Sequence, residues 1–216
     1  MPYLALALGL LPSFAWLVFY LQEDPHPEPK RLIAETFIIG ALSTFGALFV
    51  QMAVNAVGTA NGVAQYSILA FAVFGAIEEL FKFSAAKLVT VTHAKDFDEP
   101  VDAMIYMIVA ALGFATVENV VAAVRSTDLI FEAMTLRFLG ATLLHAVASG
   151  TLGYYWARAI ASGKTRLLLV GFAVATTLHV IFNYLILIYE PVVVPTIFLI
   201  IAALFVLYDF EKLKKL

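Results

Sequence analysis

The stretch from Val101 to Val124 reads VDAMIYMIVAALGFATVENVVAAV. Its only charged residues are Asp102 near the start and Glu118 near the end. A helix that crosses the hydrocarbon core of a bilayer needs about 20 mostly apolar residues. The stretch therefore predicts a transmembrane helix, and it also raises the question of why that helix carries Glu118 in an apolar context.

The composition of the whole chain extends this interpretation. Of the 216 residues, 62% are hydrophobic and 13% are charged, whereas an average soluble domain carries roughly 25% charged residues. So little charge cannot cover the surface of a soluble protein of this size, so we predict a multi-pass protein of the cell membrane, with the lipid bilayer as its main partner. The lack of cysteine excludes a disulfide scaffold. A net charge of −3 without a basic block excludes a nucleic-acid partner.

Similar apolar stretches flank this one, separated by polar, Gly- or Pro-containing connections. The sequence predicts an all-α bundle of about seven spans, as one domain over residues 1–216 with a catalytic core at about 66–189. The expected spans are Pro2–Leu21, Ile33–Val57, Tyr66–Val89, Val101–Val124, Leu129–Ala159, Leu167–Tyr189 and Pro191–Tyr208. Because the turn at Glu190 and Pro191 is very tight, six spans and a re-entrant segment are the alternative.

Basic residues in the connections predict the orientation, because Lys and Arg accumulate in cytoplasmic loops. With seven spans, Arg125 and Arg137 fall on one side of the membrane. The other side holds Lys30, Arg31, Lys87, Lys95, Arg158, Lys164, Arg166, Lys212, Lys214 and Lys215. We therefore expect the N-terminus outside and the C-terminus in the cytoplasm.

Four consecutive spans carry polar or ionisable groups in apolar surroundings. They are Glu78, Glu79 and Lys82 in the third span, Glu118 and Asn119 in the fourth, His145 in the fifth, and His179 and Asn183 in the sixth. A charge at the bilayer centre costs at least ~2.5–3.5 kcal/mol on insertion scales. Contacts between helices can explain one or two such groups, but not this set. We therefore predict a shared functional site.

Helical spacing indicates how these groups are arranged. Glu78 and Lys82 lie four residues apart and can pair along one face, and His179 and Asn183 share a face in the same way. Glu78 and Glu79 point about 100° apart. One of the two is therefore expected to face the site while the other braces a neighbouring helix.

Carboxylates and imidazoles in a partly dry cavity are suited to activating water. No Ser or Cys has an obvious nucleophile context, so a serine-type mechanism is disfavoured. Zinc is the alternative to a metal-free mechanism, with Glu78, Glu118, His145 and His179 as candidate ligands. Because the HExxH signature is absent, we expect no cofactor and keep zinc as the alternative.

The same residues resemble the motifs of a known family. Glu78 to Lys82 (EELFK) is similar to the EExxK motif of the PrsW family of intramembrane proteases, and Gly113 to Asn119 (GFATVEN) to its FxxxEN motif. Arg137 to Gly150 resembles the segment of that family that bears an arginine and a histidine, and His179 to Asn183 resembles its HxxxN motif. The related CAAX prenyl proteases carry FxxxH where this chain has FxxxE.

The resemblance implies an endopeptidase that cleaves a membrane-anchored protein, such as an anti-sigma factor, by glutamate-activated water. It implies that Glu78 is the general base, with Glu79 as the alternative. His145 or Glu118 would orient the water or protonate the leaving amine, and His179 and Asn183 would stabilise the oxyanion. Lys82, Asn119 and Arg137 would support these groups. A zinc metalloprotease, a non-catalytic scaffold and a proton-coupled transporter are the alternatives.

Overall fold

The computed structural model describes residues 2–126, 128–189 and 192–215. Within these residues it is built from helices without a β-strand, which confirms the predicted all-α fold. The elements are α1 (Pro2–Tyr20), the short 3₁₀ helix η1 (Leu21–Glu23), α2 (Lys30–Ala60), α3 (Ile68–Thr92), α4 (Asp102–Arg125), α5 (Ile130–Leu139), α6 (Ala141–Ser162), α7 (Arg166–Ile188) and α8 (Val193–Leu213).

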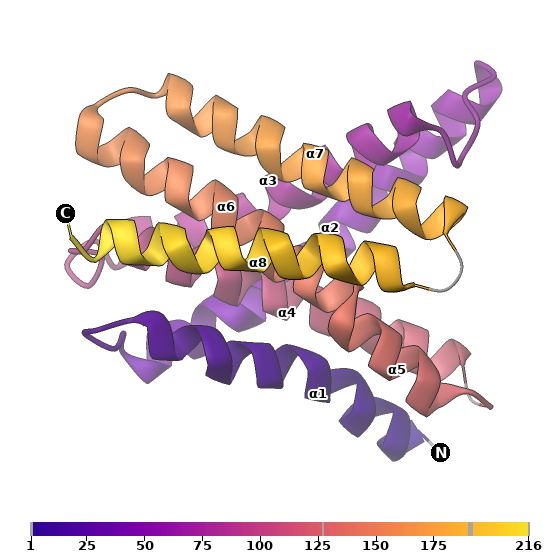
Figure 1. Cartoon of the computed structure of the whole chain (residues 1–216), viewed down its shortest axis with the longest axis horizontal. Coiled ribbons are helices and arrows are strands. Elements are labelled where there is room, and N and C mark those ends of the chain that lie inside the picture. Colours follow the sequence, from indigo (N-terminus) through magenta and orange to yellow (C-terminus); the bar gives the residue numbers. More distant parts are fainter. Residues whose placement is uncertain (1, 127, 190–191, 216) are drawn as a thin grey trace.

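Six helical segments of the described chain are long and apolar enough to cross a membrane. Helix α3 has the length but not the composition, because Glu78, Glu79 and Lys82 lie near its middle. Helix α1 begins at one end of the bundle and α8 finishes at the opposite end (Figure 1). Opposite ends are what an odd number of passes requires, as when α3 is counted together with the six apolar segments. The side of the membrane on which each end lies stays a prediction.

Large apolar side chains cover the outside of the bundle. Phe49 on α2, Leu169 on α7 and Phe205 on α8 are 76%, 71% and 65% exposed. In water this surface would cost far more than a soluble protein tolerates. Together with the six apolar segments, it confirms a multi-pass membrane protein.

The predicted fifth span is interrupted in the structure. Helix α5 ends at Leu139 and α6 begins at Ala141, so the helix is broken at Gly140. The two helices together still form one apolar segment, Ile130–Ser162, where the fifth span was predicted. Gly140 has φ −110° and ψ −100°, a backbone conformation outside the helical region. Glu190 and Pro191, where the last turn was predicted, lie outside the described residues.

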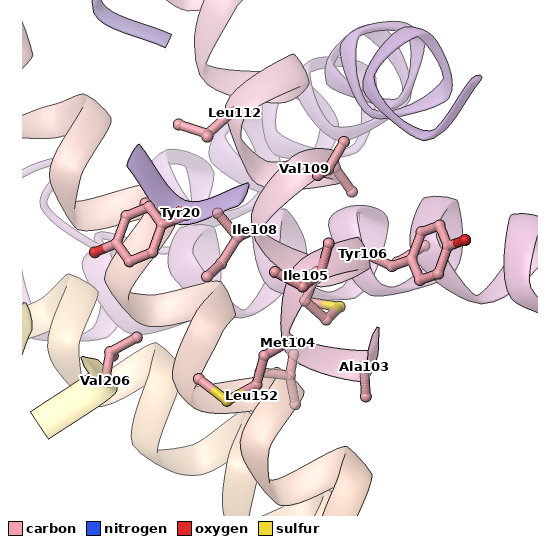
Figure 2. Close-up of a cluster of buried hydrophobic side chains, with 14 of the residues drawn as sticks. Tyr20, Ala103, Met104, Ile105, Tyr106, Ile108, Val109, Leu112, Leu152 and Val206 are labelled. Atoms are coloured by element: carbon pink, nitrogen blue, oxygen red, sulfur yellow. The ribbon is translucent and has the colours of Figure 1, made fainter. Parts of the chain in front are cut away.

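Helix α4, whose sequence predicted the fold, forms the centre of the bundle. Every residue from 101 to 116 is buried, and α4 packs mainly against α6, α2 and α1. Figure 2 shows the side chains of this core, in which Leu152 of α6 and Val206 of α8 lie near residues of α4 such as Ile108. The central helix therefore presents its polar residues to several neighbours at once.

Helices α2 and α4 approach closely because glycine lies on both sides of their crossing. A Cβ atom on Gly40 would collide with the backbone of Ala110, and one on Gly113 would collide with the carbonyl of Phe37. Small residues allow membrane helices to pack at short range through van der Waals contacts. This contact anchors α2 beside the helices that carry the site.

Near the N-terminal end of α4, hydrogen bonds fix the connection between η1 and α2 to the bundle. The Tyr106 hydroxyl donates a 2.6 Å hydrogen bond to Glu28 Oε2. Asp24 accepts from the backbone N–H groups of His26 and Glu28. These bonds hold a proline-rich loop against the start of α4.

Candidate active site

The two adjacent glutamates of α3 have different environments. Glu79 is fully buried and accepts hydrogen bonds from Lys82 Nζ at 2.8 Å, Ser149 Oγ at 2.8 Å and His179 Nε2 at 3.0 Å. The side chain of Glu78 keeps 15% of its surface exposed and faces the space between α3, α6 and α7. Glu79 therefore braces three helices, whereas Glu78 is available to a reactant.

Both predicted histidines face Glu78. Its Oε2 atom lies 3.8 Å from His145 Nδ1 on α6 and 3.8 Å from His179 Nδ1 on α7. The other ring nitrogen of each histidine has a carboxylate partner at 3.0 Å, Glu118 for His145 and Glu79 for His179. Because an ionised carboxylate only accepts hydrogen bonds, each Nε2 carries the proton and each Nδ1 presents a lone pair to the centre.

Lys82 lies at the centre of this cluster. Its ammonium group is 2.8 Å from Glu79 Oε1 and 2.7 Å from His145 Nδ1, but 3.7 Å from Glu78 Oε2. The ring of Phe114 lies 4.8 Å away on another side. The lysine thus pairs with Glu79 more closely than with Glu78, the partner that the four-residue spacing suggested.

A second polar group connects α4 with α5 and borders the more open side of the site. Arg137 Nη2 donates to Glu118 Oε2 at 3.1 Å, and Arg137 Nε donates to Asn119 Oδ1. Asn119 is fully buried and donates in turn to Thr142 Oγ1 at 3.0 Å. Glu118 is therefore held between Arg137 and His145, and about a quarter of its side chain is exposed.

Gly75 allows α7 to approach α3. A Cβ atom at this position would lie 2.8 Å from His179 Cβ, closer than real Cβ atoms approach one another. The missing side chain at Gly75, one turn before Glu79, therefore lets the His179 ring reach Glu79 and Glu78.

Comparison with known proteins identifies the family of the chain. A sequence model described as "PrsW family intramembrane metalloprotease" matches residues 28–208. The chain belongs to the PrsW family.

Proteins named Protease PrsW match the chain along most of their length. The chain is 29% identical to Protease PrsW of Geobacillus kaustophilus over 185 residues, 84% of this chain and 79% of the relative. It is 31% identical to Protease PrsW of Halalkalibacterium halodurans over 166 residues, 74% and 72% of the two chains. Protease PrsW of Bacillus subtilis is 27% identical over 187 residues, covering 83% and 81%. No solved structure matches the chain significantly.

The family description names a metal, and the donor set of this PrsW family member fits one. Ligand atoms of Glu78, His145 and His179 all lie within 4.8 Å of one another. Zinc bonds of about 2.0–2.1 Å place tetrahedral donors about 3.4 Å apart, close to the two 3.8 Å separations. A carboxylate on the far nitrogen of a histidine is also the usual support for a metal ligand. Glu118, a further candidate from the sequence, lies on the Nε2 side of His145.

Asn183 lies on α7, one turn beyond His179. Among the described residues, no hydrogen bond joins its side chain to the cluster.

Two residues that sequence reasoning did not assign to the site contact its glutamates. Ser149 binds Glu79, and its four-residue spacing from His145 was the available signal. Gln51 Nε2 binds Glu78 Oε1 at 3.1 Å, and no motif indicates it.

Proposed function

We propose that this PrsW family member is an endopeptidase that hydrolyses a peptide bond of a membrane-associated protein within the bilayer. The observation that carries the proposal is the convergence of Glu78 with two histidines, each supported by its own carboxylate, inside a bundle with an apolar exterior. Such an arrangement costs insertion energy that a scaffold has no reason to retain.

Glu78 is the proposed general base. Its Oε2 atom lies 3.8 Å from both Nδ1 atoms, and its side chain keeps 15% of its surface exposed. A water molecule in this space would transfer a proton to Glu78 as its oxygen attacks the carbonyl carbon of the substrate. Glu79 is less suited to this role, because its two oxygens already accept three hydrogen bonds.

His145 and Lys82 are the proposed source of the proton that the leaving amine needs. The short contact between Lys82 Nζ and His145 Nδ1 allows a proton to move from the ammonium to the imidazole. The C–N bond then breaks as the amine takes this proton, and the proton held by Glu78 later restores Lys82. Glu118 would support the imidazolium from the other side. The resemblance assigns the oxyanion to His179 and Asn183. His179 would donate to it only as an imidazolium with a second proton on Nδ1, because its Nε2 proton already serves Glu79.

Metal-dependent hydrolysis is the second candidate, favoured by the donor geometry and by the family description. Glu78, His145 and His179 would hold the ion, which would supply Lewis acidity and lower the pKa of a bound water. The ion would have to displace Lys82 from His145 Nδ1, so the metal-free assignment stays first. In either case Glu79 and Glu118 fix the two imidazole rings.

The proposed substrate is a protein with a membrane-embedded segment, because the cluster lies among helices with lipid-facing exteriors. An anti-sigma factor is the substrate that the resemblance implies. The cleaved sequence would have to unfold locally beside Glu78, since a peptide bond in an intact helix is shielded by its own turns.

Cleavage in proteoliposomes tests the proposal. The purified protein is incubated with a panel of single-span proteins that differ in their transmembrane segments, and the new termini are identified by mass spectrometry. We expect complementary fragments with the wild-type chain and none with His145→Ala or His179→Ala. Wild-type cleavage by either variant would contradict the proposal. Glu132→Gln, an exposed change on α5, is the control that should keep full activity.

Metal analysis separates the two mechanisms. Protein purified without chelator is assayed for bound zinc, and its activity is measured after dialysis against a strong chelator. The metal-free mechanism predicts substoichiometric zinc and unchanged activity. One equivalent of zinc, with activity lost on chelation and restored by Zn²⁺, would establish the metal-dependent alternative instead.

A further inference from the structure

Helix α2 carries none of the family motifs, but it contributes a polar contact to Glu78, the proposed general base. It packs along α3 (Figure 1), and Gln51 lies on this interface, partly buried. Gln51 Nε2 lies 3.1 Å from Glu78 Oε1 and 3.4 Å from the carbonyl oxygen of Phe74. The amide therefore connects the Glu78 carboxylate to the backbone of its own helix one turn earlier.

The chemistry of the partners fixes the orientation of this amide. A backbone carbonyl and an ionised carboxylate both accept hydrogen bonds only, so the NH₂ group of Gln51 must face them. The reverse orientation would bring three acceptor oxygens together in apolar surroundings, which is costly. Gln51 thus acts here as a neutral donor with a single stable arrangement.

The two oxygens of Glu78 are consequently divided between two tasks. Oε1 is occupied by Gln51, while Oε2 faces His145 and His179. The terminal torsion of a free glutamate is broad and roughly two-fold, so an unsupported carboxylate would rotate away from this arrangement. A donor on one oxygen restricts that rotation and keeps the other oxygen aimed at the centre.

We propose that Gln51 is a positioning residue that holds the Glu78 carboxylate in its reactive orientation, so that a helix without a family motif contributes to catalysis. This inference rests on the proposed function of Glu78. Gln51 does not contact the reacting atoms and acts through Glu78 alone. It requires the NH₂ donor, and a side chain of equal size without that donor would not replace it.

The test uses two variants of similar volume, Gln51→Met and Gln51→Glu, in the purified full-length protein with a cleavable single-span substrate. A misplaced catalytic group costs on the order of 10- to 100-fold in rate. We expect kcat to fall by roughly this factor in both variants, with KM within about threefold of wild type. Asn55→Leu, a similar apolar replacement one turn further along α2, should leave kcat unchanged.

The outcomes separate this inference from the proposed function. Wild-type kcat in both Gln51 variants, with Glu78→Gln inactive, would overturn the positioning role and leave the function of Glu78 intact. Wild-type activity of Glu78→Gln would overturn the proposed function itself. A thermal unfolding measurement in detergent accompanies the kinetics. A kcat loss shared by Asn55→Leu, or one that follows the fraction unfolded, would identify Gln51 as structural and reject the positioning role.

Discussion

Replacing Lys82 with methionine removes the positive charge at the centre of the cluster while keeping a side chain of similar length. Lys82 and Glu79 are both fully buried, and their charged atoms lie 2.8 Å apart. Removing one partner of a buried ion pair leaves an uncompensated charge and costs about 3–5 kcal/mol. We therefore expect Lys82→Met and Glu79→Gln each to lower the free energy of unfolding by about this amount.

The double variant provides the sharper test. When both charges are gone, neither residue leaves a buried charge behind, so the combined loss should be smaller than the sum of the single losses by about 0.5–3 kcal/mol. Unfolding in mixed micelles with increasing SDS, followed by the circular dichroism of the helices, measures all three variants. Lys95→Met, in an exposed loop, should stay within about 0.5 kcal/mol of wild type. Strictly additive losses, or single losses below about 1 kcal/mol, would refute the buried pair.

Three further predictions concern the surroundings of the site. Gly75→Ala should displace His179 from Glu79, reduce the rate of cleavage and destabilise the protein by about 1–3 kcal/mol through overpacking, measured by the same unfolding assay. Ser149→Ala removes a donor to Glu79 and should cost about 1.5–3 kcal/mol, without abolishing cleavage as loss of a nucleophile would. Burial raises the pKa of Glu28, outside the spans, from its ordinary value of 4.5 to about 8, although the Tyr106 hydrogen bond opposes this and the Asp102 carboxylate adds to it. The stability due to protonated Glu28 is therefore present below about pH 4.5 and lost as the pH rises through about 8. Glu28→Gln should flatten this decline, and an unchanged pH profile of unfolding would contradict the assignment.

The class of fold was predictable from the sequence because the lipid bilayer that surrounds the protein imposes it. A bilayer requires long apolar helices, and the stretch over Val101–Val124 carries that signal without any alignment. The interruption at Gly140 was not predictable from hydropathy, because its flanks are apolar on both sides. The third predicted span, Tyr66–Val89, corresponds to α3 (Ile68–Thr92), although Glu78, Glu79 and Lys82 give this helix more charge than the six segments that are apolar enough to cross a membrane.

The cluster was predictable for the same energetic reason, since ionisable groups in apolar spans are costly and few. Spacing alone did not select the partner of Lys82. Residues three and four apart share a face, and the fully buried Glu79 at the three-residue spacing forms the shorter contact. Gln51 was not predictable at all, because a glutamine in an apolar helix becomes meaningful only when packing places it against Glu78.

Glu78→Gln removes the proposed base while preserving the size of the side chain, so it tests whether Glu78 activates the water. The measurement is the rate at which purified protein in proteoliposomes cleaves a single-span substrate, with Glu132→Gln as the matched control. We expect Glu78→Gln to lose cleavage to the limit of detection, while Glu132→Gln and wild type cleave at equal rates. Cleavage by Glu78→Gln at the wild-type rate would contradict this expectation.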